Sequence, residues 1–204
     1  METISNALFW ISNGLLVPVV VLLLLFFIRS IILAGGFFSE FYQRMKLQKQ
    51  LSEILENITP ENIDEQLSAL PKAGSQPLLR CLTKLSEHRN NAAYCERLLA
   101  NFEVDAEKEL GRSRTFIKLG PMLGLMGTLI PMGPALVGLA TGDISSMAYN
   151  MQVAFATTVV GMVIAAIGVI TLQVKQRWYA REMNDLEYLE KMMKESDRVI
   201  ITEL

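Results

Sequence analysis

Residues 119–142 read LGPMLGLMGTLIPMGPALVGLATG, and residues 144–174 read ISSMAYNMQVAFATTVVGMVIAAIGVITLQV. Neither stretch contains Asp, Glu, Lys, Arg or His, and only Asp143 separates them. Each is longer than the roughly 20 apolar residues that a helix needs to cross about 30 Å of hydrocarbon. The sequence therefore predicts a transmembrane hairpin, with membrane helices at residues 115–140 and 144–174.

A third apolar stretch covers residues 15–34, where Arg29 is the only charged residue. The long stem of an arginine near a helix end lets its guanidinium reach the headgroups, so this charge is compatible with a membrane span. A cleavable signal peptide is the competing interpretation, but the stretch has neither a basic leader nor a small-residue cleavage site. We therefore predict a first membrane helix at residues 15–34. Residues 1–14, which contain Phe9 and Trp10, are predicted to form an interfacial segment at the bilayer.

The basic residues indicate how the chain is oriented. Apart from Arg29, every Lys and Arg lies either within residues 44–118 or from residue 175 onward. The positive-inside rule then predicts a multi-pass protein of the cytoplasmic (inner) membrane, with the N-terminus and Asp143 outside and the C-terminus in the cytoplasm. The net charge of −2 says little about partners, and the Lys and Arg residues alternate with Glu as on a solvated helix, so no nucleic-acid partner is expected.

The segments between and after the spans have helical patterns. Apolar residues recur at helical spacing through residues 35–114, with a break predicted near Arg89, and through the tail at residues 175–204. The last central helix and the tail helix are predicted to continue the second and third spans without a break. The predicted fold class is an all-α membrane protein: three transmembrane helices with long cytoplasmic helical extensions.

Enzymatic chemistry finds little support in the sequence. His88 has no second ligand or base beside it, so a solvated histidine is the simpler interpretation. Cys81 and Cys95 match no zinc spacing and are predicted to be small core residues. We therefore expect no catalytic residue, no metal and no cofactor.

The hairpin carries small residues at alternating steps of four and three, which places them on one stripe of each helix. The two stripes are Gly120, Gly124, Gly127, Pro131, Pro134 and Gly138, then Ala154, Thr158, Gly161, Ala165 and Gly168. Such faces let a neighbouring backbone come close. Packing within the hairpin explains either stripe alone, whereas both stripes together with several threonines favour a shared, partly polar interface between subunits. Pro131 and Pro134 are predicted to bend or loosen the second span.

Two motifs in the hairpin resemble a known family. Residues 120–128, GPMLGLMGT, resemble the proline, glycine and threonine signature that opens the penultimate helix of the MotA/TolQ/ExbB proton-channel family, and residues 156–161, ATTVVG, resemble the signature of its last helix. The single N-terminal span is similar to the layout of TolQ and ExbB. The chain departs from these subfamilies at Val153, where they commonly carry a glutamate, while the pair Thr157 and Thr158 is nearer to MotA.

The resemblance implies a homopentameric ring around the membrane helices of a small single-span partner like ExbD, TolR or MotB. Ion flow through this complex would drive a motor. By motif, Thr128 and Thr158 would line the channel with Thr157 beside them, and Pro121 would shape it. Gly124, Gly127 and Gly161 would pack the helices. The process driven, and the choice between H⁺ and Na⁺, are open at this point.

The absence of charged residues in the spans fits that expectation. A proton relay at membrane depth needs a titratable group, and threonine hydroxyls do not titrate near neutral pH. The carboxylate would therefore come from the partner, as a membrane-embedded aspartate. The alternative is a non-conducting oligomeric membrane scaffold, which would have no such partner.

Overall fold

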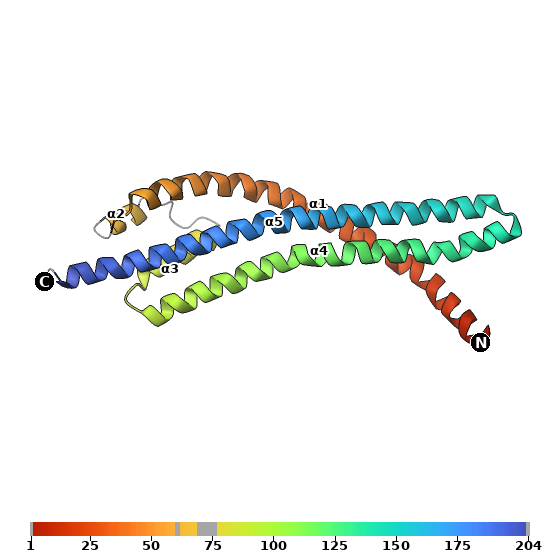
Figure 1. The fold of residues 1–204 in the computed structure, drawn as a ribbon, viewed down its shortest axis with the longest axis horizontal. Helices are drawn as coiled ribbons and strands as arrows, with labels where there is room; N and C mark the ends of the chain where they lie inside the picture. Colours follow the sequence, from red (N-terminus) through yellow and green to blue (C-terminus); the bar gives the residue numbers. More distant parts are fainter. Residues whose placement is uncertain (1, 60–61, 69–76, 203–204) are drawn as a thin grey trace. The chain divides into compact units, whose positions relative to one another are not determined.

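The computed structural model describes residues 2–59, 62–68 and 77–202, and these residues form helices and no strand. The elements are α1 (Glu2–Asn57), α2 (Ile63–Ser68), α3 (Pro77–Glu87), α4 (Ala92–Thr141) and α5 (Ile144–Thr202), as Figure 1 shows. Three of them, α1, α4 and α5, are long and apolar enough to cross a membrane. The predicted all-α membrane fold is thus confirmed.

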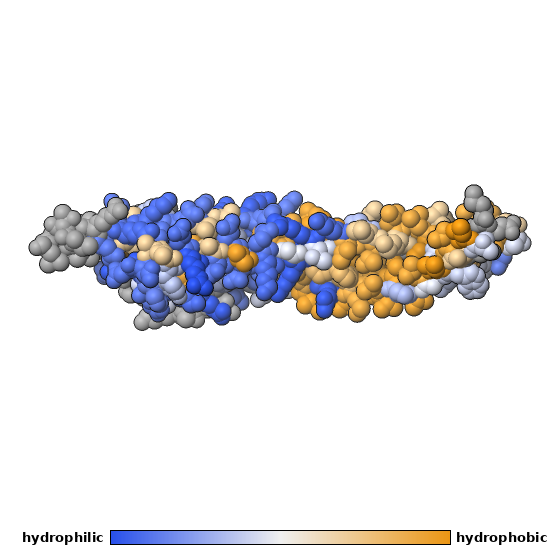
Figure 2. All heavy atoms as spheres, turned by 90° about the horizontal axis from the view of Figure 1, so that it is seen from below, coloured by the Kyte–Doolittle hydropathy of each residue, from blue (hydrophilic) through white to orange (hydrophobic). Residues whose placement is uncertain are grey.

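Two compact units divide the chain. The first, here called the membrane unit, contains Met1–Phe37 and Gly111–Gln173; the second, here called the bundle, contains Phe38–Leu110 and Val174–Leu204. On the face drawn in Figure 2, apolar residues cover most of the membrane unit and polar residues cover most of the bundle. Large apolar side chains of the membrane unit are exposed, among them Val17, Leu125 and Met162. A hydrocarbon solvent accepts such side chains, whereas water would not favour so many together.

The predicted continuity of the long helices is confirmed. Helix α4 runs from Ala92 to Thr141 and α5 from Ile144 to Thr202, each through an apolar and a polar stretch. The predicted break near Arg89 is also present, because α3 ends at Glu87 and Asn91 caps the start of α4 by accepting a hydrogen bond from the Tyr94 amide at 3.1 Å. Residues 2–14 are not separated from the first span by a break, since α1 is continuous from Glu2. The exact membrane boundaries stay a prediction.

The bundle is held by an apolar core and by ion pairs between its helices. The core includes Leu47, Leu51, Leu82, Leu85, Leu99, Leu186 and Leu189. Lys175 of α5 is buried and pairs with Glu40 of α1 at 2.9 Å and with Glu109 of α4 at 3.6 Å. One cation therefore contacts carboxylates from both neighbouring helices and keeps these three positions at the same level of the bundle.

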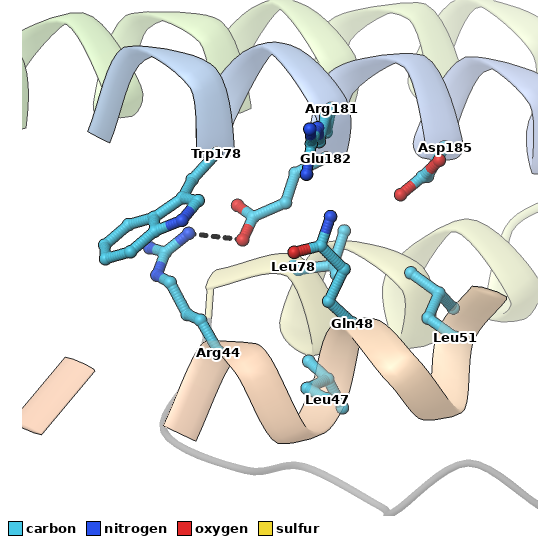
Figure 3. A pocket seen from close by; sticks show the side chains of 9 residues that line it. All are labelled: Arg44, Leu47, Gln48, Leu51, Leu78, Trp178, Arg181, Glu182 and Asp185. Carbon is cyan, nitrogen blue, oxygen red and sulfur yellow. Dashed lines mark hydrogen bonds and ion pairs between the residues drawn. The ribbon is translucent and has the colours of Figure 1, made fainter. Parts of the chain in front are cut away.

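A second buried ion pair joins α1 to α5. Arg44 donates to Glu182, and its guanidinium carbon lies 5.3 Å from the Trp178 ring centroid and 4.8 Å from the Tyr179 ring centroid. Figure 3 shows Arg44, Trp178 and Glu182 of this arrangement, which line a small cavity of about 20 Å³. Burial raises the pKa of the Glu182 carboxyl, and the nearby Arg44 guanidinium offsets part of that rise. Because an unpaired charge is costly in such a place, this pair holds α1 to α5 at a defined level.

Candidate functional site

The hairpin of α4 and α5 packs through glycines at backbone distance. A Cβ atom added at Gly161 would lie 2.6 Å from the carbonyl oxygen of Gly120 and 3.0 Å from the Cα of Gly124. A Cβ at Gly120 would lie 2.7 Å from the carbonyl oxygen of Gly161. Only hydrogen fits at these positions, so the small-residue stripes of the two helices face each other within one chain. This contact lies inside the hairpin, and the interface between subunits that the sequence favoured for these stripes stays a prediction.

Thr157 takes part in this contact. A Cβ at Gly127 would lie 2.6 Å from the Thr157 Cβ, and the Thr157 side chain is buried. Its hydroxyl donates to the carbonyl oxygen of Ala154 at 2.9 Å. Thr157 is therefore committed to helix packing, with its polar atom satisfied within its own helix.

Thr158 is in a different situation. Its side chain is half-buried, and its hydroxyl lies 3.3 Å from the same Ala154 carbonyl that already accepts from Thr157. Thr128, also half-buried, donates to the carbonyl oxygen of Leu125 at 2.7 Å. A hydroxyl that donates still has lone pairs that accept hydrogen bonds. Both threonines can thus accept from a water or a protonated carboxyl group, and the long Thr158 bond leaves its proton the easiest to redirect.

Thr128 and Thr158 lie on the same side of the hairpin. Thr128 follows Gly127 by about 100° around α4, and Thr158 follows Thr157 by about 100° around α5. The helices are antiparallel and Gly127 meets Thr157, so both steps lead out of the contact on the same side. The two hydroxyls are therefore neighbours along one edge of the hairpin, which we call the threonine edge.

Helix α1 packs against the opposite side of the hairpin. Leu23 of α1 forms a buried cluster with Phe116 and Ile164, and further apolar residues pack against that cluster: Phe26, Phe27, Leu33, Leu123 and Val160. Leu123 and Val160 each come one residue before a glycine of the helix contact. One residue back along a helix is a turn of about 100° in the direction opposite to that of Thr128 and Thr158, so both side chains lie on the side away from the threonine edge. Within one chain, α1 thus leaves the threonine edge uncovered.

The three prolines of α4 lie inside a helix that continues through them. Pro131 is fully buried, Pro134 is half-buried, and Pro121 is exposed. Each proline removes the amide that would bond the carbonyl four residues earlier, which for Pro131 is the carbonyl of Gly127. A carbonyl without its helical donor thus lies at the level where α4 meets Thr157.

Asp143, the one charged residue between positions 119 and 174, belongs to the turn. Its Oδ1 atom accepts a hydrogen bond from the Ser146 amide at 3.0 Å, which caps the start of α5. The preceding Gly142 has a φ of 77°, a left-handed conformation that suits glycine at a helix end. Asp143 is exposed and has a capping role, and the spans on either side of it, residues 119–142 and 144–174, contain no Asp, Glu, Lys, Arg or His.

One polar contact of the hairpin escaped the sequence analysis. Ser113 of α4 and Thr171 of α5 are buried, and their hydroxyl oxygens lie 3.1 Å apart. Thr171 follows Gly168 by three residues, whereas the four-three rhythm of the α5 stripe leads to Leu172, so the rhythm alone would not have found this contact. The contact region therefore extends beyond the predicted stripe, to the end of the membrane unit.

Comparison with protein families gives one match. The model of a family described as the MotA/TolQ/ExbB proton channel family matches residues 62–188. This region includes both motifs of the hairpin and every threonine discussed above. A search of curated proteins found no match.

Proposed function

The chain belongs to the MotA/TolQ/ExbB proton channel family, and on this premise we propose that it is the channel-forming stator subunit of a proton-driven motor. Three apolar helices and the family indicate an inner-membrane protein rather than a known type of enzyme. In the proposed complex, five copies form a ring around the membrane helices of a small ExbD-, TolR- or MotB-like partner. Each copy turns its threonine edge toward those helices.

The observation that carries this proposal is a hairpin whose spans, residues 119–142 and 144–174, contain no Asp, Glu, Lys, Arg or His and which leaves two threonine hydroxyls uncovered by α1. Proton transfer across a bilayer needs a group that binds and releases the proton at depth. Thr128 and Thr158 can hold a water or a carboxyl group by hydrogen bonds but cannot store the proton. An aspartate on the partner helix would supply the missing group, and the threonine edge would hold it in place.

Reconstitution into vesicles tests this division of roles. The chain alone should give no proton uptake above that of empty vesicles, and the chain with its partner should conduct when a proton gradient is applied. Replacing the partner's membrane aspartate with asparagine should return uptake to the background. The readout is the fluorescence of a pH-sensitive dye inside the vesicles.

The scaffold alternative gives a different result in this experiment. A non-conducting scaffold would bind its partners, yet uptake would stay at background with every partner tested. Uptake by the chain alone would contradict the proposal in another way, because it would mean that no external carboxylate is needed.

The orientation of the chain is a separate prediction. The one-sided distribution of Lys and Arg predicts that Asp143 lies outside and Glu195 in the cytoplasm. A cysteine substituted at Asp143 should react with an impermeant thiol reagent added to intact cells, and one at Glu195 should react only after the membrane is opened. Labelling with the reverse pattern would overturn the orientation.

A further inference from the structure

We propose that the bundle has its own subunit contact, in which the outer face of α1 in one copy fills a groove between α4 and α5 of the next copy. This inference rests on the proposed ring and names a contact that the family match does not assign. It involves residues of the bundle alone and none of the threonine edge. Two surfaces carry it.

The first surface is a groove of about 300 Å³ between α4 and α5. Its apolar lining comes from Phe102, Ala106, Leu110, Tyr179 and Met183. Three exposed carboxylates line it as well, those of Glu103, Glu107 and Glu187, and no basic side chain does. The groove therefore suits an apolar surface that carries positive charge.

The second surface is the side of α1 that points away from the bundle core. Arg44, Leu47 and Leu51 are buried on the inner side. The opposite side, here called the α1 outer face, consists of Phe38, Tyr42, Met45, Lys46 and Lys49, which share one side at helical spacing. Tyr42 is 78% exposed and Met45 is 45% exposed, which is unusual for apolar side chains beside a polar bundle surface.

The charges of the two surfaces are complementary. The α1 outer face carries Lys46 and Lys49 and no carboxylate, because Glu40 lies on the inner side and pairs with Lys175. Complementary charges around an apolar contact favour one pairing of surfaces and disfavour others. A second copy of the chain supplies this combination of two aromatic residues, a methionine and two lysines.

The α1 outer face and the groove lie at the same position along the length of the bundle helices, which favours a closed ring. Contacts of Lys175 with Glu40 and Glu109 place these positions of α5, α1 and α4 side by side. The α1 outer face and the groove thus occupy the same level of one bundle. A head-to-tail contact between two different surfaces closes into a ring only if it rotates each copy without moving it along the axis. Matching levels satisfy that condition, whereas offset levels would generate a filament.

Cysteine crosslinking in the full-length protein tests the contact. Met45→Cys is placed in a copy with one affinity tag and Ala180→Cys, beside the groove, in a copy with another. A short bifunctional maleimide should join the two in membranes, giving a product that carries both tags. The parent chain is the background control, since Cys81 and Cys95 are buried and burial raises the pKa of the Cys81 thiol to about 11, which suppresses its thiolate.

Lys108→Cys is the matched control, because Lys108 is exposed on the side of α4 opposite Ala106. The doubly tagged product should form with Ala180→Cys and be lost with Lys108→Cys.

In the same membranes, Lys46→Glu with Lys49→Glu should weaken ring formation by about tenfold, as expected for two to three exposed ion pairs. Adding Glu103→Lys and Glu187→Lys should restore the ring.

The outcomes separate this contact from the ring itself. If the parent chain forms a ring but Met45→Cys does not crosslink to Ala180→Cys, the bundle contact is wrong and the ring proposal stands. Crosslinking of Met45→Cys to a different protein instead of a second copy overturns the contact as well. If the parent chain is monomeric in native mass measurements, the proposed ring is wrong and the contact falls with it.

Discussion

Replacing Thr158 with valine should lower proton flux by about tenfold or more while the complex still assembles. Valine keeps the shape of threonine but has no hydroxyl, so the half-buried edge position loses its hydrogen-bonding group. A buried carboxyl group or water that loses such a bond is destabilised by about 1–3 kcal/mol. A shift of that size moves the protonation equilibrium of a carboxylate by roughly one pKa unit or more. The measurement is proton uptake in vesicles that contain the chain and its partner.

Two companion variants identify the hydroxyl as the cause. Thr158→Ser keeps the hydroxyl and should retain most of the flux. Thr157→Val should have the smaller effect, because Thr157 is buried against Gly127 and its hydroxyl bonds within its own helix at 2.9 Å. Full activity in Thr158→Val, at normal abundance, would remove this residue from the proton path.

Gly161→Ala should prevent the hairpin from packing and strongly reduce the amount of folded protein. The added methyl would lie 2.6 Å from the Gly120 carbonyl oxygen and 3.0 Å from the Gly124 Cα, which are both backbone atoms of α4. No side-chain rotation can relieve a clash with backbone, so the helices must separate. Overpacking of this kind costs about 1–3 kcal/mol and occasionally more. Thermal unfolding of the detergent-solubilised protein measures the loss.

Gly133→Ala is the matched control on α4. A Cβ at Gly133 would meet only the Phe9 ring, at 4.0 Å, which is an ordinary van der Waals distance. This variant should unfold within a few degrees of the parent. Equal stability of Gly161→Ala and the parent would show that α4 and α5 do not pack through these glycines.

Local features of the chain were predictable because neighbouring residues produce them. The break between α3 and α4 follows from a polar run that ends in the capping residue Asn91. The continuity of α5 through position 174 follows from a helical pattern with no proline after Pro134. Both depend on contacts within a few residues, so the sequence contains them directly.

The partner of each helix face was not predictable in the same way. The small-residue stripes of α4 and α5 were evident, but their spacing indicates only that something comes close. The structure pairs Gly120 and Gly124 with Gly161 of the same chain. The Arg44–Glu182 ion pair joins residues 138 positions apart, and no local pattern marks two surface-type residues as buried partners.

The sequence by itself determined that this is an all-helical membrane protein and which family it resembles, because hydropathy, helix breakers and short motifs act over neighbouring residues. Only the tertiary structure decided that Thr157 is buried in the helix contact while Thr128 and Thr158 lie on the edge that α1 leaves uncovered. The physical reason is that a helix turns by about 100° per residue, so adjacent threonines point in different directions. Which direction faces a neighbour depends on how distant segments pack.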